Sequence, residues 1–178
     1  QILRALQGIS IQRCHSLEDL LAALGRLSVT NDPHRNWVED PEQGLPLRLV
    51  VVDSVSAAIA PMLGADQHFL GQGLLGTLGG TLNQLATKRS ELCILVVNTT
   101  VAFSRGGGDG GASGMDQQPK AALGRSWSYF PSTRVMLSWA PQSTASIQVH
   151  LLKHPTKPTP QAMTRLLCVS TTGIEDVK

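Results

Sequence analysis

The chain has 178 residues, of which 42% are apolar and 16% are charged, with a formal net charge of +2. This length suits one domain, and the apolar content is enough for a substantial core. The net charge is too small to mark a nucleic-acid binder by bulk electrostatics, so any DNA contact must come from a local basic patch. No run of about 18 apolar residues occurs, so the sequence predicts no membrane-spanning helix.

The beginning of the chain lacks the basic start, apolar stretch and cleavage site of a secretory signal. The first residue is Gln1 rather than Met, so we expect a fragment from which some features have been cut away. The three cysteines, Cys14, Cys93 and Cys168, lie singly in or beside apolar runs and have no metal-ligand spacing. We expect them to be buried free thiols in a reducing compartment.

The first predicted elements are a short strand over residues 8–13 and a helix that begins after Ser16. Ser16 is a typical N-cap, and Asp19 stands three residues later as its capping partner. Apolar residues then recur on one helical face: Leu17, Leu20, Leu21, Leu24 and Leu27. Residues 28–46 are polar and rich in proline, which predicts a surface loop.

Two nearly continuous apolar runs, at residues 47–52 and 92–97, predict buried strands. Such runs are typical of parallel sheets covered on both faces. Between them, residues 66–88 predict a helix with one stripe of leucines: Leu70, Leu74, Leu78, Leu82 and Leu85. Its opposite stripe holds Gly73, Gly76 and Gly80, which either allow another backbone to approach closely or only weaken the helix.

The second half of the chain opens with a glycine-rich segment at residues 104–119, which we expect to be a flexible loop. A short helical piece at 123–130 stops at Pro131, and residues 133–139, 146–152 and 165–170 predict three strands. The first two strands form a hairpin around residues 140–143. The predicted fold is therefore α/β, a mainly parallel sheet flanked by helices with an antiparallel C-terminal extension at one edge.

Polar residues stand where the two buried strands end: Asp53 and Ser54 after the first, Asn98 and Thr99 after the second. Ligands of open α/β sheets bind beyond the carboxyl ends of their strands. An aspartate there can hold the Mg²⁺ that bridges ATP phosphates, directly or through water, and Asn98 and Thr99 can sense the terminal phosphate. The alternative is that these residues only terminate the strands.

A phosphate loop of the form G-x-x-x-x-G-K-[ST] is missing from the sequence. We expect it before residue 1, and we expect the chain alone not to hold ATP tightly. A G-x-S-x-G nucleophile motif is also absent, which argues against hydrolase chemistry.

Basic residues near the glycine-rich segment, Arg105, Lys120 and Arg125, predict contact with a phosphate backbone. The alternative is a solvated loop without a ligand. Trp127 and Tyr129 lie nearby, and they either stack on bases or belong to the core.

Three stretches together resemble the RecA-type DNA recombinases of eukaryotes. Residues 47–64 (LRLVVVDSVSAAIAPMLG) are similar to the acidic strand of that family, and residues 96–100 (VVNTT) to its next core strand. Residues 122–137 (ALGRSWSYFPSTRVML) are similar to the paralogues that assist the main recombinase, and within them to the D-type branch. The resemblance runs from about residue 8 to residue 177.

The resemblance implies one partial RecA-like P-loop NTPase domain over residues 1–178, whose phosphate-loop part lies outside the chain. Asp53 would hold Mg²⁺ through water, with Ser54, Asn98, Thr99 and Lys153 around ATP. Residues 100–120 and 61–71 would be mobile DNA-facing loops, and residues 153–157 would lie where one subunit caps its neighbour's nucleotide. Partners would be other paralogues and single-stranded DNA, in the nucleus, without a membrane.

The chain departs from the family in two places. The main recombinases have Asn-Gln where this chain has Asn98-Thr99, and the glycine-rich segment is longer and less basic than theirs. Three functions follow: an ATP-dependent accessory protein of homologous-recombination repair of double-strand breaks, a non-catalytic scaffold subunit of a paralogue complex, or another ATPase with a RecA-like fold. In the first, the complete protein is a DNA-dependent ATPase and the chain alone is inactive.

Overall fold

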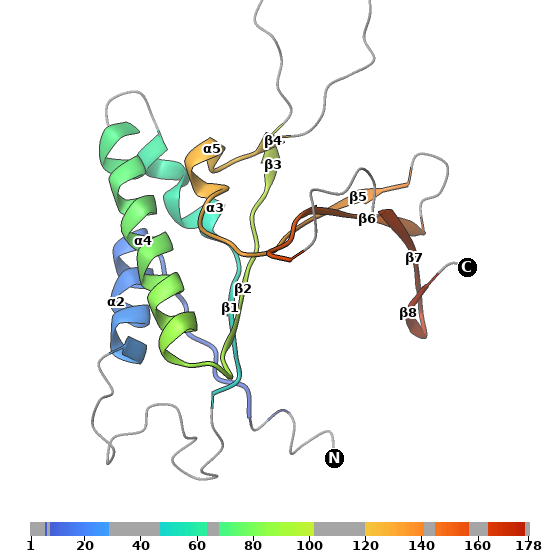
Figure 1. The fold of residues 1–178 in the computed structure, drawn as a ribbon, viewed down its shortest axis with the longest axis horizontal. Helices are drawn as coiled ribbons and strands as arrows, with labels where there is room; N and C mark the ends of the chain where they lie inside the picture. The colour runs from blue at the N-terminus through green and yellow to red at the C-terminus, as the bar shows by residue number, and fades with distance from the viewer. Residues whose placement is uncertain are drawn as a thin grey trace, which may run out of the picture. The chain divides into compact units, whose positions relative to one another are not determined.

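The computed structural model describes residues 6, 8–28, 47–63, 68–101, 120–140, 145–156 and 164–176. It is a mixed α/β structure that divides into two compact units, Gln1–Phe130 and Pro131–Lys178 (Figure 1). The first unit contains, in chain order, α2 Leu17–Ser28, β1 Leu49–Val52, α3 Val55–Ile59, the 3₁₀ helix η1 Ala60–Leu63, α4 His68–Lys88, β2 Cys93–Val96, β3 Thr100–Val101, β4 Lys120–Ala121 and α5 Gly124–Trp127. The second contains β5 Arg134–Trp139, β6 Ser146–Lys153, β7 Thr164–Ser170 and β8 Gly173–Asp176.

Helix α2 begins as its sequence predicts. Ser16 Oγ accepts a hydrogen bond from the Asp19 amide at 3.1 Å, and Asp19 Oδ2 accepts one from the His15 amide at 3.0 Å. The two side chains therefore satisfy backbone donors that a helix start leaves unpaired. The predicted leucine face is buried or half-buried in the core, and Arg89 after α4 donates to the Leu27 carbonyl at 3.2 Å.

The predicted strand at residues 8–13 is wrong. Among the described residues this segment pairs with no strand, and Ile9 and Ile11 are 60% and 86% exposed. A strand persists only where a neighbouring backbone takes up its hydrogen bonds, and no described segment does so here. The predicted loop at 28–46 lies outside the described residues, except Ser28, which ends α2.

Strands β1 and β2 pair in parallel, with Leu49 opposite Cys93 and Val52 opposite Val96, which confirms two neighbouring parallel strands. Within this unit α2 and α4 lie side by side on one side of the pair (Figure 1). Alternate residues of the two strands pack into the core on that side: Val50, Val52, Ile94 and Val96.

The opposite face of β1 and β2 is exposed, so the prediction that both faces are covered is wrong for the described residues. Leu49, Val51 and Leu95 are 52%, 52% and 53% exposed. Cys93 shares this face by strand alternation and is exposed, contrary to its expected burial, whereas Cys14 and Cys168 are half-buried. All three cysteines are free thiols, as expected.

Helix α4 matches the predicted helix, and its close contacts occur at other glycines than expected. Gly73, Gly76 and Gly80 have open space where a Cβ would stand. At Gly79 a Cβ would overlap the Phe130 ring, and at Gly71 it would lie 2.8 Å from the Met62 carbonyl oxygen. The leucine stripe is buried at Leu78, Leu82 and Leu85 and half-buried at Leu74, and it ends at Leu70, which is exposed.

The second unit is a four-stranded antiparallel sheet in the order β5-β6-β7-β8. The three predicted strands and their hairpin are confirmed, with Leu137 opposite Val149; β8 was not predicted. His150 joins three strands, because its Nδ1 lies 3.0 Å from Thr164 Oγ1 and its Nε2 lies 3.4 Å from Ser138 Oγ. Among the described residues no pairing connects this sheet to β1 or β2, so the expected continuous sheet edge is not found.

No helix in the described part of the chain is long and apolar enough to cross a membrane.

The contact at Gly79 predicts opposite effects for two alanine substitutions in α4. Gly79→Ala should lower the free energy of unfolding by about 1–3 kcal/mol, because the new methyl displaces the Phe130 ring. Gly76→Ala should raise it by up to about 1 kcal/mol, because alanine favours the helix and meets open space. Urea unfolding followed by circular dichroism measures both; equal stabilisation by the two variants would refute the Phe130 contact.

The exposed sheet face predicts poor solubility of the isolated chain. Val51→Lys should increase the monomeric fraction in light scattering, because it places a charge on an apolar surface that water reaches. Val52→Lys, one residue along, should prevent folding, because Val52 is only 7% exposed and its replacement buries an unpaired charge. A monomeric wild-type chain that melts cooperatively, or unfolding caused by Val51→Lys, would contradict this description of the face.

Candidate functional site

The carboxyl ends of β1 and β2 meet at one edge of the parallel pair. Beyond the last register pair, the Val97 amide donates to the Val52 carbonyl at 2.9 Å, and the Val55 amide donates to the Val97 carbonyl at 3.2 Å. Asp53 and Asn98 therefore leave their strands at the same end of the sheet, as predicted from the sequence.

Asp53 and Ser54 have different local roles at this edge. The Asp53 side chain is exposed to solvent. Ser54 is the N-cap of α3, with extended backbone angles, and its Oγ accepts from the Ala57 amide at 3.3 Å. The peptide bond between them is cis. Capping gives Ser54 a structural function, whereas the Asp53 carboxylate is open to a ligand.

Ser56 is a buried polar residue of this edge that the sequence reasoning missed. It is 8% exposed, and its Oγ accepts from the Thr99 amide at 3.3 Å and lies 3.2 Å from Ser54 Oγ. Ser56 thus ties the segment after β1 to the segment after β2. The sequence contained one indication of this buried role, because Ser56 is the single polar residue among the otherwise apolar residues 55–59.

Asn98 and Thr99 lie differently at the end of β2. Asn98 is half-buried, and its Oδ1 is a buried acceptor with no hydrogen-bond partner among the described residues. Such an acceptor costs about 1–3 kcal/mol until a donor reaches it. Thr99 is exposed. A carboxylate and an amide oxygen at one strand edge are the kind of oxygen ligands that suit Mg²⁺ and its bound water.

Beyond Thr99 the chain continues into a small antiparallel pair whose strands flank residues 102–119. Thr100 lies opposite Ala121 and Val101 opposite Lys120, and the Ala122 amide donates to the Thr99 carbonyl at 2.9 Å. The predicted flexible segment and its Arg105 lie outside the described residues, as does the Lys120 side chain. Arg125 is described and is exposed on α5.

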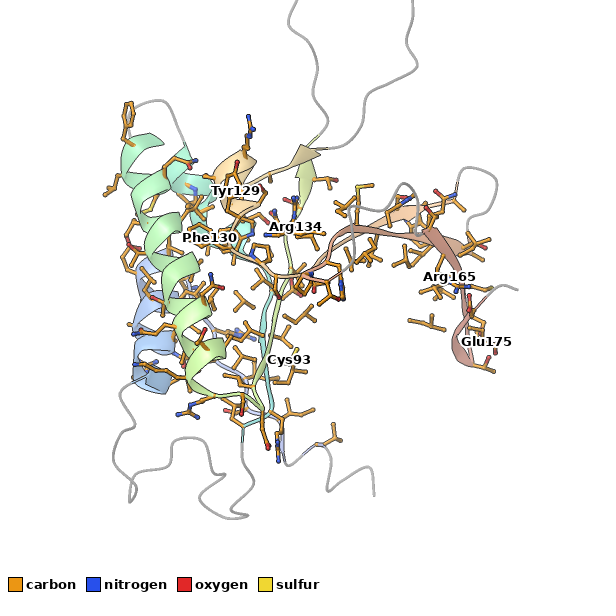
Figure 2. The ribbon with its side chains drawn as sticks, viewed as in Figure 1. Cys93, Tyr129, Phe130, Arg134, Arg165 and Glu175 are labelled. Carbon is orange, nitrogen blue, oxygen red and sulfur yellow. The ribbon has the colours of Figure 1, made fainter. Side chains whose placement is uncertain are left out.

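The two aromatic residues near Arg125 separate into core and surface. Trp127 is 5% exposed, and its ring centroid lies 5.7 Å from that of Phe130. Figure 2 shows Phe130 beside α4, where its ring meets Gly79. The core interpretation is therefore confirmed for Trp127. Tyr129 is 69% exposed.

Lys153 belongs to the second unit, where it ends β6 opposite Arg134. Its role beside a nucleotide stays a prediction. In the described ranges no group of three or more His, Cys, Asp or Glu side chains is placed to hold a metal ion by itself.

The chain is similar to two curated proteins, both named DNA repair protein RAD51 homolog 4. It is 40% identical to the Bos taurus protein over 117 residues, covering 64% of this chain and 32% of that protein. It is 33% identical to the Mus musculus protein over 134 residues, covering 73% of this chain and 36% of that protein. The chain therefore spans about a third of the length of these relatives. It matches no protein-family model.

These identities extend over most of the chain and confirm the resemblance to the D-type branch of the recombinase paralogues. The chain is a homologue of RAD51 homolog 4, a RecA-type recombinase paralogue, over part of that protein's length.

Proposed function

We propose that the chain is part of an ATP-dependent accessory protein of homologous-recombination repair of double-strand breaks, which binds single-stranded DNA and other recombinase paralogues in the nucleus. The main support for this proposal is that Asp53 and Asn98 lie at the same carboxyl edge of a parallel strand pair. The similarity to proteins named for DNA repair supports the biological setting. The two compact units then belong to one RecA-like ATPase domain.

The residues at this edge fit a magnesium nucleotide. The exposed Asp53 carboxylate would accept from water on Mg²⁺, and the buried Asn98 Oδ1 needs a donor that such water supplies. Ser54 and Thr99 would complete the surroundings of the nucleotide, and Lys153, in the second unit, would cap the nucleotide of a neighbouring subunit. Mg²⁺ supplies charge neutralisation at the ATP phosphates. Because the sequence contains no phosphate loop, these residues would contribute the carboxylate of the magnesium site. They would not bind the phosphates themselves.

Single-stranded DNA would lie near α5 and the small β3–β4 pair. Arg125 is exposed there, and Lys120 belongs to β4. Arg105 follows β3 in the sequence. Each cation that neutralises a phosphate releases counterions, which makes the affinity fall as salt rises.

A non-catalytic scaffold is the second candidate, and two observations favour it. Thr99 stands where the main recombinases have Gln, and its amide is already bonded to Ser56 Oγ. The exposed apolar face of β1 and β2 suits docking of another subunit. In this alternative Asp53 has no nucleotide to hold.

The substitution Asp53→Ala separates the two candidates. It is best made in a chimera in which this chain replaces the matching third of the Bos taurus relative, with Asp176→Ala as a control for loss of an exposed acid in β8. Repair of double-strand breaks in cells that lack the relative should fall for Asp53→Ala and stay normal for Asp176→Ala, with paralogue binding kept by both. Normal repair by Asp53→Ala would reject the nucleotide role and leave the scaffold.

Binding of a fluorescein-labelled oligo(dT) to the same chimera, with and without further substitutions, tests the proposed DNA interface directly. Fluorescence anisotropy between about 50 and 200 mM salt should show affinity falling with salt, and Arg125→Ala should reduce the log–log slope by about 0.7, because one phosphate is then left without its cation. Arg165→Ala removes an exposed arginine from β7 and should leave the slope unchanged. Equal slopes for all three proteins would exclude Arg125 from the interface, and no binding at low salt with a paralogue present would refute DNA binding.

A further inference from the structure

The segment of residues 123–130, which includes α5, has two distinct sides. Leu123 and Trp127 are buried, and Phe130 packs partly buried against the core, so the spacing i, i+4, i+7 marks the inner side. The outer side consists of Arg125, Ser126 and Tyr129, all exposed. Tyr129 stands four residues after Arg125, in the turn that follows α5, where its amide donates to the Ser126 carbonyl at 3.3 Å.

Contacts from both sides fix this segment against α4. Ser126 Oγ donates to Gln72 Oε1 of α4 at 2.9 Å, and the Phe130 ring fills the space over Gly79. Ser128 Oγ donates to the Arg125 carbonyl at 2.6 Å and so stabilises the turn between Arg125 and Tyr129. An exposed aromatic ring on an anchored turn is a preformed surface, because little ordering is needed when a flat ligand meets it.

The charge around this surface has one sign. Neither α4 nor α5 contains an Asp or Glu. Over residues 120–130 the sequence has two basic residues, Lys120 and Arg125, and no acidic one. This part of the first unit therefore attracts a polyanion.

We propose that Tyr129 and Arg125 form a stacking site for one base of single-stranded DNA, in which the Tyr129 ring stacks on the base and the Arg125 guanidinium contacts the adjacent phosphate. Every base has a flat π-face, so such a site tolerates any sequence. Trp127 cannot take this role, because its ring is buried against Phe130. The inference rests on the proposed DNA binding and deepens it, since it names the part of the strand that is recognised.

Two labelled oligonucleotides with equal numbers of phosphates separate stacking from charge: oligo(dT) and a strand of abasic spacers. Fluorescence anisotropy at low salt should show that the chimera without a further substitution, called wild type here, binds oligo(dT) about 5-fold or more tightly than the abasic strand. Tyr129→Ala should remove this preference while keeping the salt slope, and Tyr129→Phe should retain it. Arg125→Ala should reduce the slope, and Trp139→Ala, which removes another exposed aromatic ring, should change neither quantity.

The outcomes distinguish this inference from the function on which it rests. If wild type binds oligo(dT) and Tyr129→Ala keeps the full preference over the abasic strand, the stacking site is refuted while DNA binding stands. If wild type binds neither strand, both are refuted. Far-ultraviolet circular dichroism of Tyr129→Ala controls for folding, and loss of preference in Tyr129→Phe as well would also overturn the stacking role, because phenylalanine stacks without the hydroxyl.

Discussion

The parallel register of β1 and β2 is the constraint on which the rest of the first unit depends. Val52 lies opposite Val96, and two backbone hydrogen bonds continue the pairing past the strand ends through Val97 and Val55. A parallel pair brings both carboxyl ends to one edge, whereas an antiparallel pair would separate them. Asp53 and Asn98 are neighbours at a site only because of this register.

From that edge a continuous set of hydrogen bonds leads to α5. Ser54 and Ser56 are in hydrogen-bond contact, Ser56 Oγ accepts from the Thr99 amide, and the Thr99 carbonyl accepts from the Ala122 amide, two residues before α5. The acidic end of the site and the exposed arginine and tyrosine are therefore parts of one connected framework. Coupling between its two ends would require an element of the framework that adopts two arrangements.

The sequence was most informative where structure depends on neighbours along the chain. The Ser16–Asp19 cap, the leucine faces of α2 and α4 and the apolar runs of β1 and β2 all follow from short-range patterns. The strand expected at residues 8–13 failed because a strand requires a partner elsewhere in the chain. The small strands β3 and β4 have two residues each, which is too short to show a period.

The rest of the site depended on contacts that no local pattern encodes. The spacing of the glycines in α4 does not distinguish Gly79, which faces Phe130, from Gly76, which faces open space. The same holds for Ser56, whose partner lies 43 residues away, and for Trp127 and Tyr129, whose burial is opposite although they are two residues apart. The position of Asp53 and Asn98 at one edge was predictable, because the direction of parallel strands fixes it.

The most direct test of the proposed site is the alignment of β1 against β2 in solution, measured by nuclear Overhauser contacts between backbone protons of the isotope-labelled Val51→Lys chain. The parallel register predicts contacts of Val52 with Val96 and Val97, and slow hydrogen exchange of the Val97 amide bonded to Val52. Contacts of Val52 with Cys93 instead would indicate antiparallel pairing. That result would place Asp53 and Asn98 at opposite ends of the strands and contradict the site.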